Sequence, residues 1–222
     1  MPAFFQRKLQ HYGTFLPLAI LFCLLLGGNR VHAGKGEDVI QKAQAKFRSL
    51  KTLSLRLEVQ YKTATDSSAE QGRLIWAQGG RFRMETARQT IVSNGKIIWS
   101  YNAQENQVIL YDARSENNPF LTPQQLLFEY PQKYRVQSVE NVTLDDLPCD
   151  LLAMQPKDQT DPTKELRVWV DRREHFTRRL QMEDLAGNQT VFNFEDFISG
   201  QNLPDSTFHF VPPQTAEVID AR

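Results

Sequence analysis

Residues 53–61, LSLRLEVQY, alternate strictly between apolar and polar side chains. Successive side chains of a β-strand point to opposite faces of a sheet, so this period of two predicts a long strand with one buried face. Further segments with strand character, most of them shorter, follow at residues 73–77, 81–85, 91–92, 97–101, 108–111, 134–139, 149–155, 165–171, 177–183 and 189–197. The pattern predicts a mainly β chain with about ten strands.

One segment before the first strand has a helical pattern instead. Between residues 37 and 50 the apolar side chains recur every three or four positions, with Lys and Arg between them. This spacing places the apolar side chains on one side of a helix and predicts an amphipathic helix.

A second, shorter helix is predicted midway along the chain. Thr122 is followed by Pro123 and Gln125, a combination typical of a capped helix start. We expect a helix over residues 123–130, ended by Pro131 because proline cannot donate a backbone hydrogen bond.

The clearest turn signal is Asn94-Gly95, which predicts a hairpin with a type I′ turn because both residues tolerate a positive φ. The polar residues 63–71 are predicted to form a turn or loop. Apolar residues also occur on both faces of the predicted strands around Asn94-Gly95.

The predicted elements indicate an α+β fold built on one strongly curved antiparallel sheet. Twist accumulates across a sheet of many strands, so the sheet must curl. The two helices are expected to cover its concave side and to contribute their apolar faces to the interior. The many large apolar residues either fill an ordinary core or line a ligand cavity, and the curvature favours enclosed space.

The first 33 residues resemble a secretory signal peptide. Arg7 and Lys8 precede an apolar segment, and the small residues Val31 and Ala33 suit cleavage after Ala33. Pro17 interrupts the apolar segment, which is short for a retained membrane anchor. Cys23 lacks the small preceding residues of a lipoprotein signal. We expect a single domain over residues 34–222, exported and not lipidated.

Several function classes have little support. The balance of 26 basic and 26 acidic residues gives no indication of nucleic-acid binding. Cys149 is the only cysteine after residue 33, so no disulfide within the domain is expected. No metal-ligand spacing, nucleophile elbow or phosphate-binding glycine loop occurs, so neither cofactor nor enzymatic activity is predicted. The acid pairs 145–146, 183–184 and 195–196 are interpreted as solvated charges rather than general acids and bases.

A basic group surrounds one predicted turn and consists of Arg172, Arg173, Arg178 and Arg179. These residues could dock an acidic partner or anionic lipid headgroups, or they could belong to a solvated hairpin end. The second interpretation is favoured.

The segments GRLIWAQGGRFRMET, QTIVSNGKIIWSYNAQENQV, NPFLTPQQLL and STFHFVPPQTAEVID resemble the outer-membrane lipoprotein carrier family, LolA. The resemblance extends over essentially all of residues 34–222. It implies an incomplete β barrel with a helical lid, whose apolar interior takes the acyl chains of lipoproteins. We therefore expect lipid contacts from Phe47, Leu53, Phe82, Met84, Ile91, Trp99, Leu121, Leu126 and Leu127.

The chain departs from the family at one position. An Arg-Pro pair commonly precedes the strand that carries Phe82, and its arginine holds the lid closed by hydrogen bonds to helix carbonyls. Gln78-Gly79 stands there in this chain. The opening step is then tuned differently, or another group such as Arg81 or Arg83 holds the lid.

The resemblance implies a monomeric periplasmic chaperone that receives acylated lipoproteins from an inner-membrane ABC-type release complex. It would deliver them to an outer-membrane lipoprotein receptor. The alternative is a periplasmic sensor or scaffold of the same fold that recognises lipid or misassembled protein. A lipid-processing enzyme is a third hypothesis, without a motif to support it.

Overall fold

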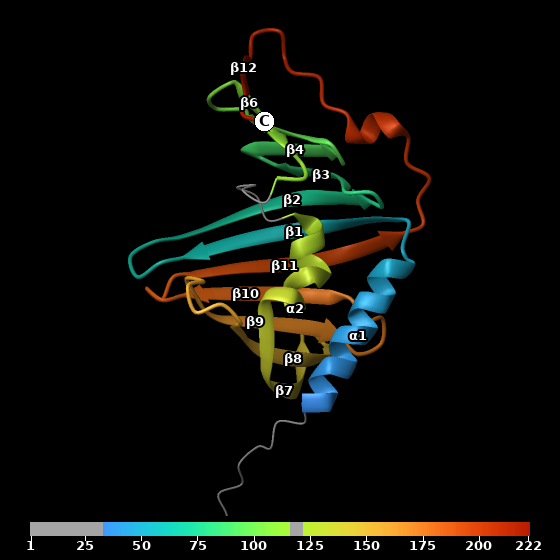
Figure 1. The fold of residues 1–222 in the computed structure, drawn as a ribbon, viewed down its shortest axis with the longest axis vertical. Coiled ribbons are helices and arrows are strands. Elements are labelled where there is room, and N and C mark those ends of the chain that lie inside the picture. Colours follow the sequence, from blue (N-terminus) through green and yellow to red (C-terminus); the bar gives the residue numbers. More distant parts are fainter. Residues whose placement is uncertain (1–32, 116–121) are drawn as a thin grey trace, which may run out of the picture. The chain divides into compact units, whose positions relative to one another are not determined.

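The computed structural model describes residues 33–115 and 122–222 (Figure 1). The predicted signal peptide and Leu121 therefore lie outside the described residues, apart from Ala33. The helices are α1 (Ala33–Ser49), η1 (Gln125–Glu129), α2 (Tyr130–Lys133) and η2 (Asp205–Phe208). The strands are β1 (Thr52–Lys62), β2 (Ser67–Ala77), β3 (Arg81–Thr86), β4 (Gln89–Asn94), β5 (Ile97–Asn102), β6 (Gln107–Asp112), β7 (Tyr134–Leu144), β8 (Leu147–Pro156), β9 (Thr163–Asp171), β10 (Thr177–Asp184), β11 (Gln189–Ser199) and β12 (Glu217–Asp220).

These twelve strands form one sheet in the order β12-β6-β5-β4-β3-β2-β1-β11-β10-β9-β8-β7. Neighbouring strands are antiparallel except β12, which runs parallel to β6. The sheet is curved but does not close, since β7 and β12 remain as its edges (Figure 1). The predicted α+β fold, with an incomplete barrel and helices over one face, is confirmed.

Strand β1 joins the two halves of the sheet, because it pairs with β2 on one side and with β11 on the other. Its alternation is confirmed over most of its length, with Leu53, Leu55, Leu57 and Val59 buried in the main core. Tyr61 departs from the prediction and is 49% exposed.

Helix α1 confirms the first helical prediction and begins four residues earlier than expected. Its apolar side faces the interior, where Val39, Ala43 and Phe47 are buried in the main core. The helix ends at Ser49, and the Leu50 N–H donates to the Phe47 carbonyl at 3.0 Å as the chain turns into β1. Helical periodicity therefore identified both the element and its buried side.

The predicted cap of the second helical segment is confirmed. The Thr122 N–H donates to Gln125 Oε1 at 2.9 Å, and the Gln125 N–H donates to Thr122 Oγ1 at 3.3 Å. This reciprocal pair satisfies two backbone donors at the start of the segment.

The predicted end at Pro131 is wrong, because helix continues through α2 to Lys133. Pro131 lies in the first turn of α2, after the wide turn of η1. A proline there cannot donate to the Leu127 carbonyl, which accepts instead from the Thr177 hydroxyl at 3.0 Å. The Thr177 hydroxyl on β10 thus satisfies the Leu127 carbonyl, for which Pro131 has no N–H to donate.

The hairpin around Asn94 is confirmed, but its turn is not type I′. The two loop residues are Gly95 and Lys96, and only Gly95 has a positive φ, 86°. Asn94 Oδ1 instead accepts the N–H groups of Lys96 and Ile97, both at 2.9 Å. A Cβ atom on Gly95 would lie 2.3 Å from the Gly79 carbonyl oxygen, so this close approach also requires glycine.

Two strand segments were not predicted, because their side chains are mostly exposed and show no apolar alternation. The expected loop at residues 63–71 is largely strand, since β1 and β2 pair out to Lys62 and Ser67. Strand β12 was not predicted, and all four of its residues are exposed. Backbone hydrogen bonding holds both segments, so a pattern of apolar side chains could not reveal them.

The two faces of β2–β6 meet different surroundings. Concave-face residues such as Ile91 and Ile98 join the main core. On the convex face, Val92, Trp99 and Val108 pack with Phe210, while Ile75 and Ala77 pack with Phe208. The C-terminal segment therefore covers the convex side and accounts for apolar residues on both faces of these strands.

Candidate functional site

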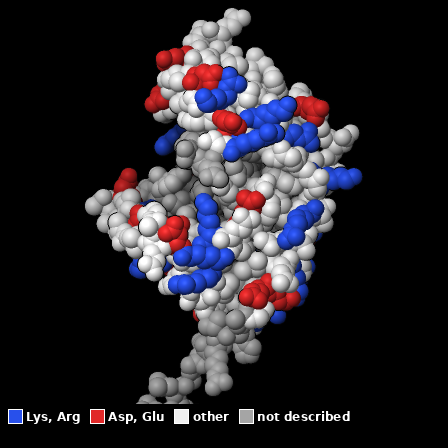
Figure 2. Space-filling model, in the orientation of Figure 1, with Lys and Arg blue, Asp and Glu red and all other residues white. Residues whose placement is uncertain are grey.

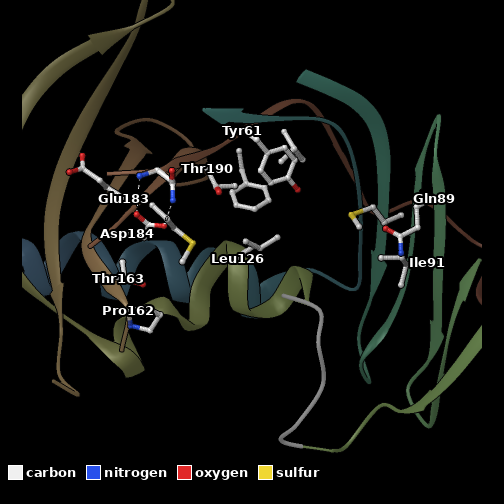
Figure 3. A pocket seen from close by; sticks show the side chains of 14 residues that line it. Tyr61, Gln89, Ile91, Leu126, Pro162, Thr163, Glu183, Asp184 and Thr190 are labelled. Carbon is white, nitrogen blue, oxygen red and sulfur yellow. Dashed lines mark hydrogen bonds between the residues drawn. The ribbon is translucent and has the colours of Figure 1, made fainter. Parts of the chain in front are cut away.

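The concave side contains a cavity of about 450 Å³ between the two halves of the sheet. Gln89 and Ile91 lie on one wall, Glu183 and Thr190 on the other, and Leu126 of η1 lies between the walls (Figure 3). The full lining consists of Val59, Tyr61, Met84, Gln89, Ile91, Leu126, Pro162, Thr163, Met182, Glu183, Asp184, Asn188, Thr190 and Phe192.

Two further cavities lie next to η1. The second, of about 260 Å³, is bounded by β2–β5 residues such as Trp76 and Phe82 and by residues 122–125 and 129. The third, of about 330 Å³, lies between the helical segment and β9–β10. Leu126 lines the first and third cavities, whereas Gln125 and Glu129 line the second and third. The inserted helix therefore borders all three cavities.

Most of the surface of the first cavity is apolar, and polar side chains complete its lining. Its ionisable lining residues, among those described, are Tyr61, Glu183 and Asp184. The hydrogen bond from Lys164 lowers the pKa of Glu183, and those from Asn188 lower the pKa of Asp184, so both are charged at neutral pH. On the face in Figure 2, acidic and basic side chains are interspersed. The predominantly apolar surface of the cavity suits an apolar ligand.

The predicted lipid contacts fall into several groups. Met84, Ile91 and Leu126 line the first cavity, and Phe82 lines the second. Phe47, Leu53 and Leu127 are buried in the adjoining core. Leu121 lies outside the described residues. Their contact with lipid remains a prediction, but six of the expected side chains share one continuous interior with Phe82.

Trp99 does not share that interior. It lies on the convex face with Val92 and Val108, and its ring is 5.4 Å from that of His209. Ile98 occupies the concave side instead, because adjacent residues of a strand point to opposite faces. The expectation that Trp99 lines the cavity is therefore wrong.

Several lining residues were missing from the expected set, and most belong to the second half of the sheet. Met182 and Phe192 face Ile91 across the first cavity, and Trp76 borders the second. Phe192 and Phe194 alternate in β11, a signal visible in the sequence. The sequence does not show which strands lie opposite one another across the cavity, because their positions depend on the strand order in the sheet.

The two helical segments contact each other over the concave face. The Phe47 ring stacks on Phe128 with centroids 4.0 Å apart and meets Trp76 edge-on at 4.4 Å. Gln44 Nε2 also donates to the Phe128 carbonyl at 3.2 Å. Movement of either helix would therefore disturb the other.

Gln78, at the position of departure from the family pattern, contacts the end of the first helical segment. Its Nε2 donates to the Leu50 carbonyl at 2.9 Å. Arg81 pairs with Asp205 at 2.9 Å, and Arg83 pairs with Glu85 at 2.6 Å. Among the described contacts, neither Arg81 nor Arg83 bonds to a helix carbonyl, contrary to the expectation that one of them holds the lid.

The basic group at the β9–β10 turn is only partly a solvated hairpin end. Arg178 Nη2 lies 2.7 Å from Oδ2 of Asp171, whose side chain is 2% exposed. Arg179 donates to Asn193 Oδ1 at 2.6 Å. Burial opposes ionisation of Asp171, but N–H donors from Arg173, Arg178 and Glu174 lower its pKa overall. These two arginines thus stabilise the fold.

Other reactive groups offer little chemistry. Cys149 is buried, and burial raises its pKa to about 11, so the thiol is protonated at neutral pH. The described residues contain no group of three or more His, Cys, Asp or Glu that could hold a metal ion. Over the same ranges, no helix is both long and apolar enough to span a membrane.

The fold and cavities define a class of half-barrel proteins whose apolar interior lies beneath helices. The model of the outer membrane lipoprotein carrier protein LolA matches residues 49–211, and the chain belongs to this family. An outer-membrane lipoprotein carrier protein of Albidiferax ferrireducens is 30% identical over 67% of this chain and 72% of its own length.

Two other similarities extend over more of the chain. An uncharacterized protein of Methanocaldococcus jannaschii is 20% identical over 83% of this chain, which spans about half (54%) of that relative. The crystal structure of an uncharacterized conserved protein from Thermus thermophilus superposes with a TM-score of 0.57 and 13% identity, covering 84% of this chain and 99% of that one. The latter similarity supports the fold.

Proposed function

We propose that the chain is a periplasmic chaperone that binds the acyl chains of lipoproteins and shuttles them between membranes. The observation that carries this proposal is the cavity of about 450 Å³ between the walls of a half-barrel in a LolA-family chain. Most of the surface of this cavity is apolar, and methylenes gain free energy from such surroundings.

The energetics support a carrier. Burial of one methylene group contributes about 0.8 kcal/mol, so a chain of about a dozen gains on the order of 10 kcal/mol before losses. Such a ligand needs protection while it crosses water. The arrangement of η1 between three cavities supports a mechanism in which the helices move aside and the cavities merge around the chain.

In this proposal an inner-membrane ABC-type complex supplies the lipoprotein, and an outer-membrane receptor accepts it. The hydrogen bond of Gln78 and the contacts of Phe47 favour the closed arrangement. Opening must break these contacts, and ligand burial offsets their loss. A carrier can then release its ligand to a receptor that binds acyl chains more favourably.

Native mass spectrometry after crosslinking in the periplasm tests this function. We expect complexes of the chain with acylated lipoproteins. A Met84→Asp variant, which places a charge in the cavity wall, should lose them. A Val218→Asp variant is the control, because Val218 is 52% exposed on β12. Wild-type protein recovered without lipoprotein would contradict the proposal.

The alternative of a sensor or scaffold relied on Gln78 at the usual arginine position. Gln78 nevertheless contacts the Leu50 carbonyl, so this departure no longer favours a sensor. Deletion distinguishes the two roles: loss of a carrier should mislocalise outer-membrane lipoproteins, whereas loss of a sensor should leave their sorting intact.

A further inference from the structure

The second cavity borders a buried polar group without a partner in the described part of the chain. Trp76 of β2 is 5% exposed and lines this cavity, and its indole Nε1 has no hydrogen-bond partner among the described residues. Buried donors in native proteins are nearly always paired, and an unpaired one lowers stability. A ligand that supplies an acceptor would remove this cost.

Other polar side chains around this cavity already have partners. Gln125 Oε1 accepts from Thr122, Gln124 donates to Glu129, and the Ser93 hydroxyl donates to the Gly80 carbonyl at 2.9 Å. An acceptor offered to Trp76 would therefore pair a donor that none of these side chains satisfies.

The charge around the cavity further restricts the acceptor. Glu129 is the one ionisable residue among the described lining residues, so neither Lys nor Arg is present there to neutralise an anion. A buried carboxylate would lack a counter-charge and would be repelled by Glu129. A neutral carbonyl oxygen of an ester or amide avoids both costs.

Apolar side chains form the part of the lining next to Trp76. Phe82 and Ile98 line the same cavity as Trp76, and Phe82 is paired with Trp76 across β2 and β3. Paired residues of adjacent antiparallel strands lie side by side on one face. Methylenes next to the carbonyl could therefore contact these side chains.

We propose that the indole N–H of Trp76 binds the carbonyl oxygen of an ester- or amide-linked acyl chain, so that the protein prefers acylated ligands to free fatty acids and alkyl ethers. This inference rests on the proposed function and deepens it. The indole nitrogen is covered in this structure, and Phe47 packs against the indole ring. The carbonyl reaches it as α1 moves aside, in the same step that opens the cavities.

Competition against an environment-sensitive apolar dye tests the inference with three ligands of equal chain length. These are a peptide carrying dipalmitoylglyceryl cysteine, its dihexadecyl ether analogue and palmitate. We expect the ester to bind about tenfold more tightly than the ether, which corresponds to about 1.4 kcal/mol. Palmitate should also bind more weakly than the ester.

Trp76→Phe removes the N–H but keeps an aromatic ring, so the difference between ester and ether should disappear. Trp99→Phe is the matched control on the convex face and should keep the difference. Melting temperatures verify that both variants fold. The wild-type comparison remains decisive if Trp76→Phe does not fold.

Equal binding of ester and ether by the wild-type protein would overturn the inference and leave the proposed function standing. A preference that persists in folded Trp76→Phe would have the same consequence. If none of the ligands displaces the dye, the proposed function fails together with the inference.

Discussion

The side-chain amide of Gln78 donates a hydrogen bond of 2.9 Å to the backbone carbonyl of Leu50, where α1 leads into β1. The backbone N–H of Gln78 also donates to the Lys51 carbonyl at 3.1 Å. Gln78, the residue after β2, therefore makes two hydrogen bonds to the loop between α1 and β1. The side-chain bond can be removed without removing the backbone bond.

Replacement of Gln78 should alter how readily the interior opens. Gln78→Ala removes one hydrogen bond, so we expect a loss of about 1 kcal/mol in unfolding free energy and faster uptake of an apolar dye. Gln78→Arg offers more donors to the helix carbonyls and should slow uptake. Urea titration and stopped-flow fluorescence measure the two effects, and identical uptake rates in all three proteins would show that this contact does not control opening.

Phe82 allows cavity lining to be separated from core packing. Phe82→Ser should keep most of the thermal stability and lose dye or lipopeptide binding, because one side of Phe82 borders a cavity. Phe194, 1% exposed in the main core and absent from the cavity linings, is the control. Phe194→Ser should cost at least the roughly 3–5 kcal/mol of a truncated buried phenylalanine.

Melting temperature and dye binding on the same samples measure both quantities. If Phe82→Ser is as unstable as Phe194→Ser but its folded fraction binds normally, Phe82 belongs to the packed core and not to the ligand site.

The buried pair of Asp171 and Arg178 should make stability depend on pH. The pKa of Asp171 is lowered in the folded protein, so its contribution is present above the ordinary aspartate pKa and is lost as pH falls through the folded value. We expect Asp171→Asn to cost about 3 kcal/mol at neutral pH, because Arg178 is left without its buried partner.

Urea titrations at about pH 7 and about pH 3 measure the difference in unfolding free energy between wild type and Asp171→Asn. This difference should shrink at the lower pH, where Asp171 becomes protonated. Glu195→Gln removes a carboxylate from an exposed pair with Arg56 and should cost less stability than Asp171→Asn, because solvent screens exposed pairs. An equal difference in unfolding free energy between wild type and Asp171→Asn at both pH values would show that ionisation of Asp171 does not contribute to stability.

The convex-side core should affect stability without affecting ligand binding. Phe208 is 2% exposed and packs with Ile75 and Ala77, on the opposite face from the cavities. Phe208→Ala should cost about 3 kcal/mol and leave the affinity of the folded protein for an apolar dye unchanged. Calorimetry and dye titration test this separation, and a large loss of affinity would connect the C-terminal segment to the site.

Local sequence patterns predict most of the helices and strands together with their buried sides. Period-two alternation identified β1, three-and-four spacing identified α1, and Thr122 with Gln125 marked a helix start that the hydrogen bonds confirm. These features depend on residues close together in the chain, and local backbone geometry translates them directly into structure.

The surroundings of each sheet face depend on segments that are distant in the chain. Val92 and Trp99 are paired across β4 and β5, but the C-terminal segment makes their face a separate core. Pro131 lies within helix because Thr177, distant in sequence, occupies the Leu127 carbonyl. Strand β12 is held by backbone pairing with β6, and Trp76 borders a cavity because η1 lies opposite it. Such contacts join residues far apart in the chain, so no local pattern specifies them.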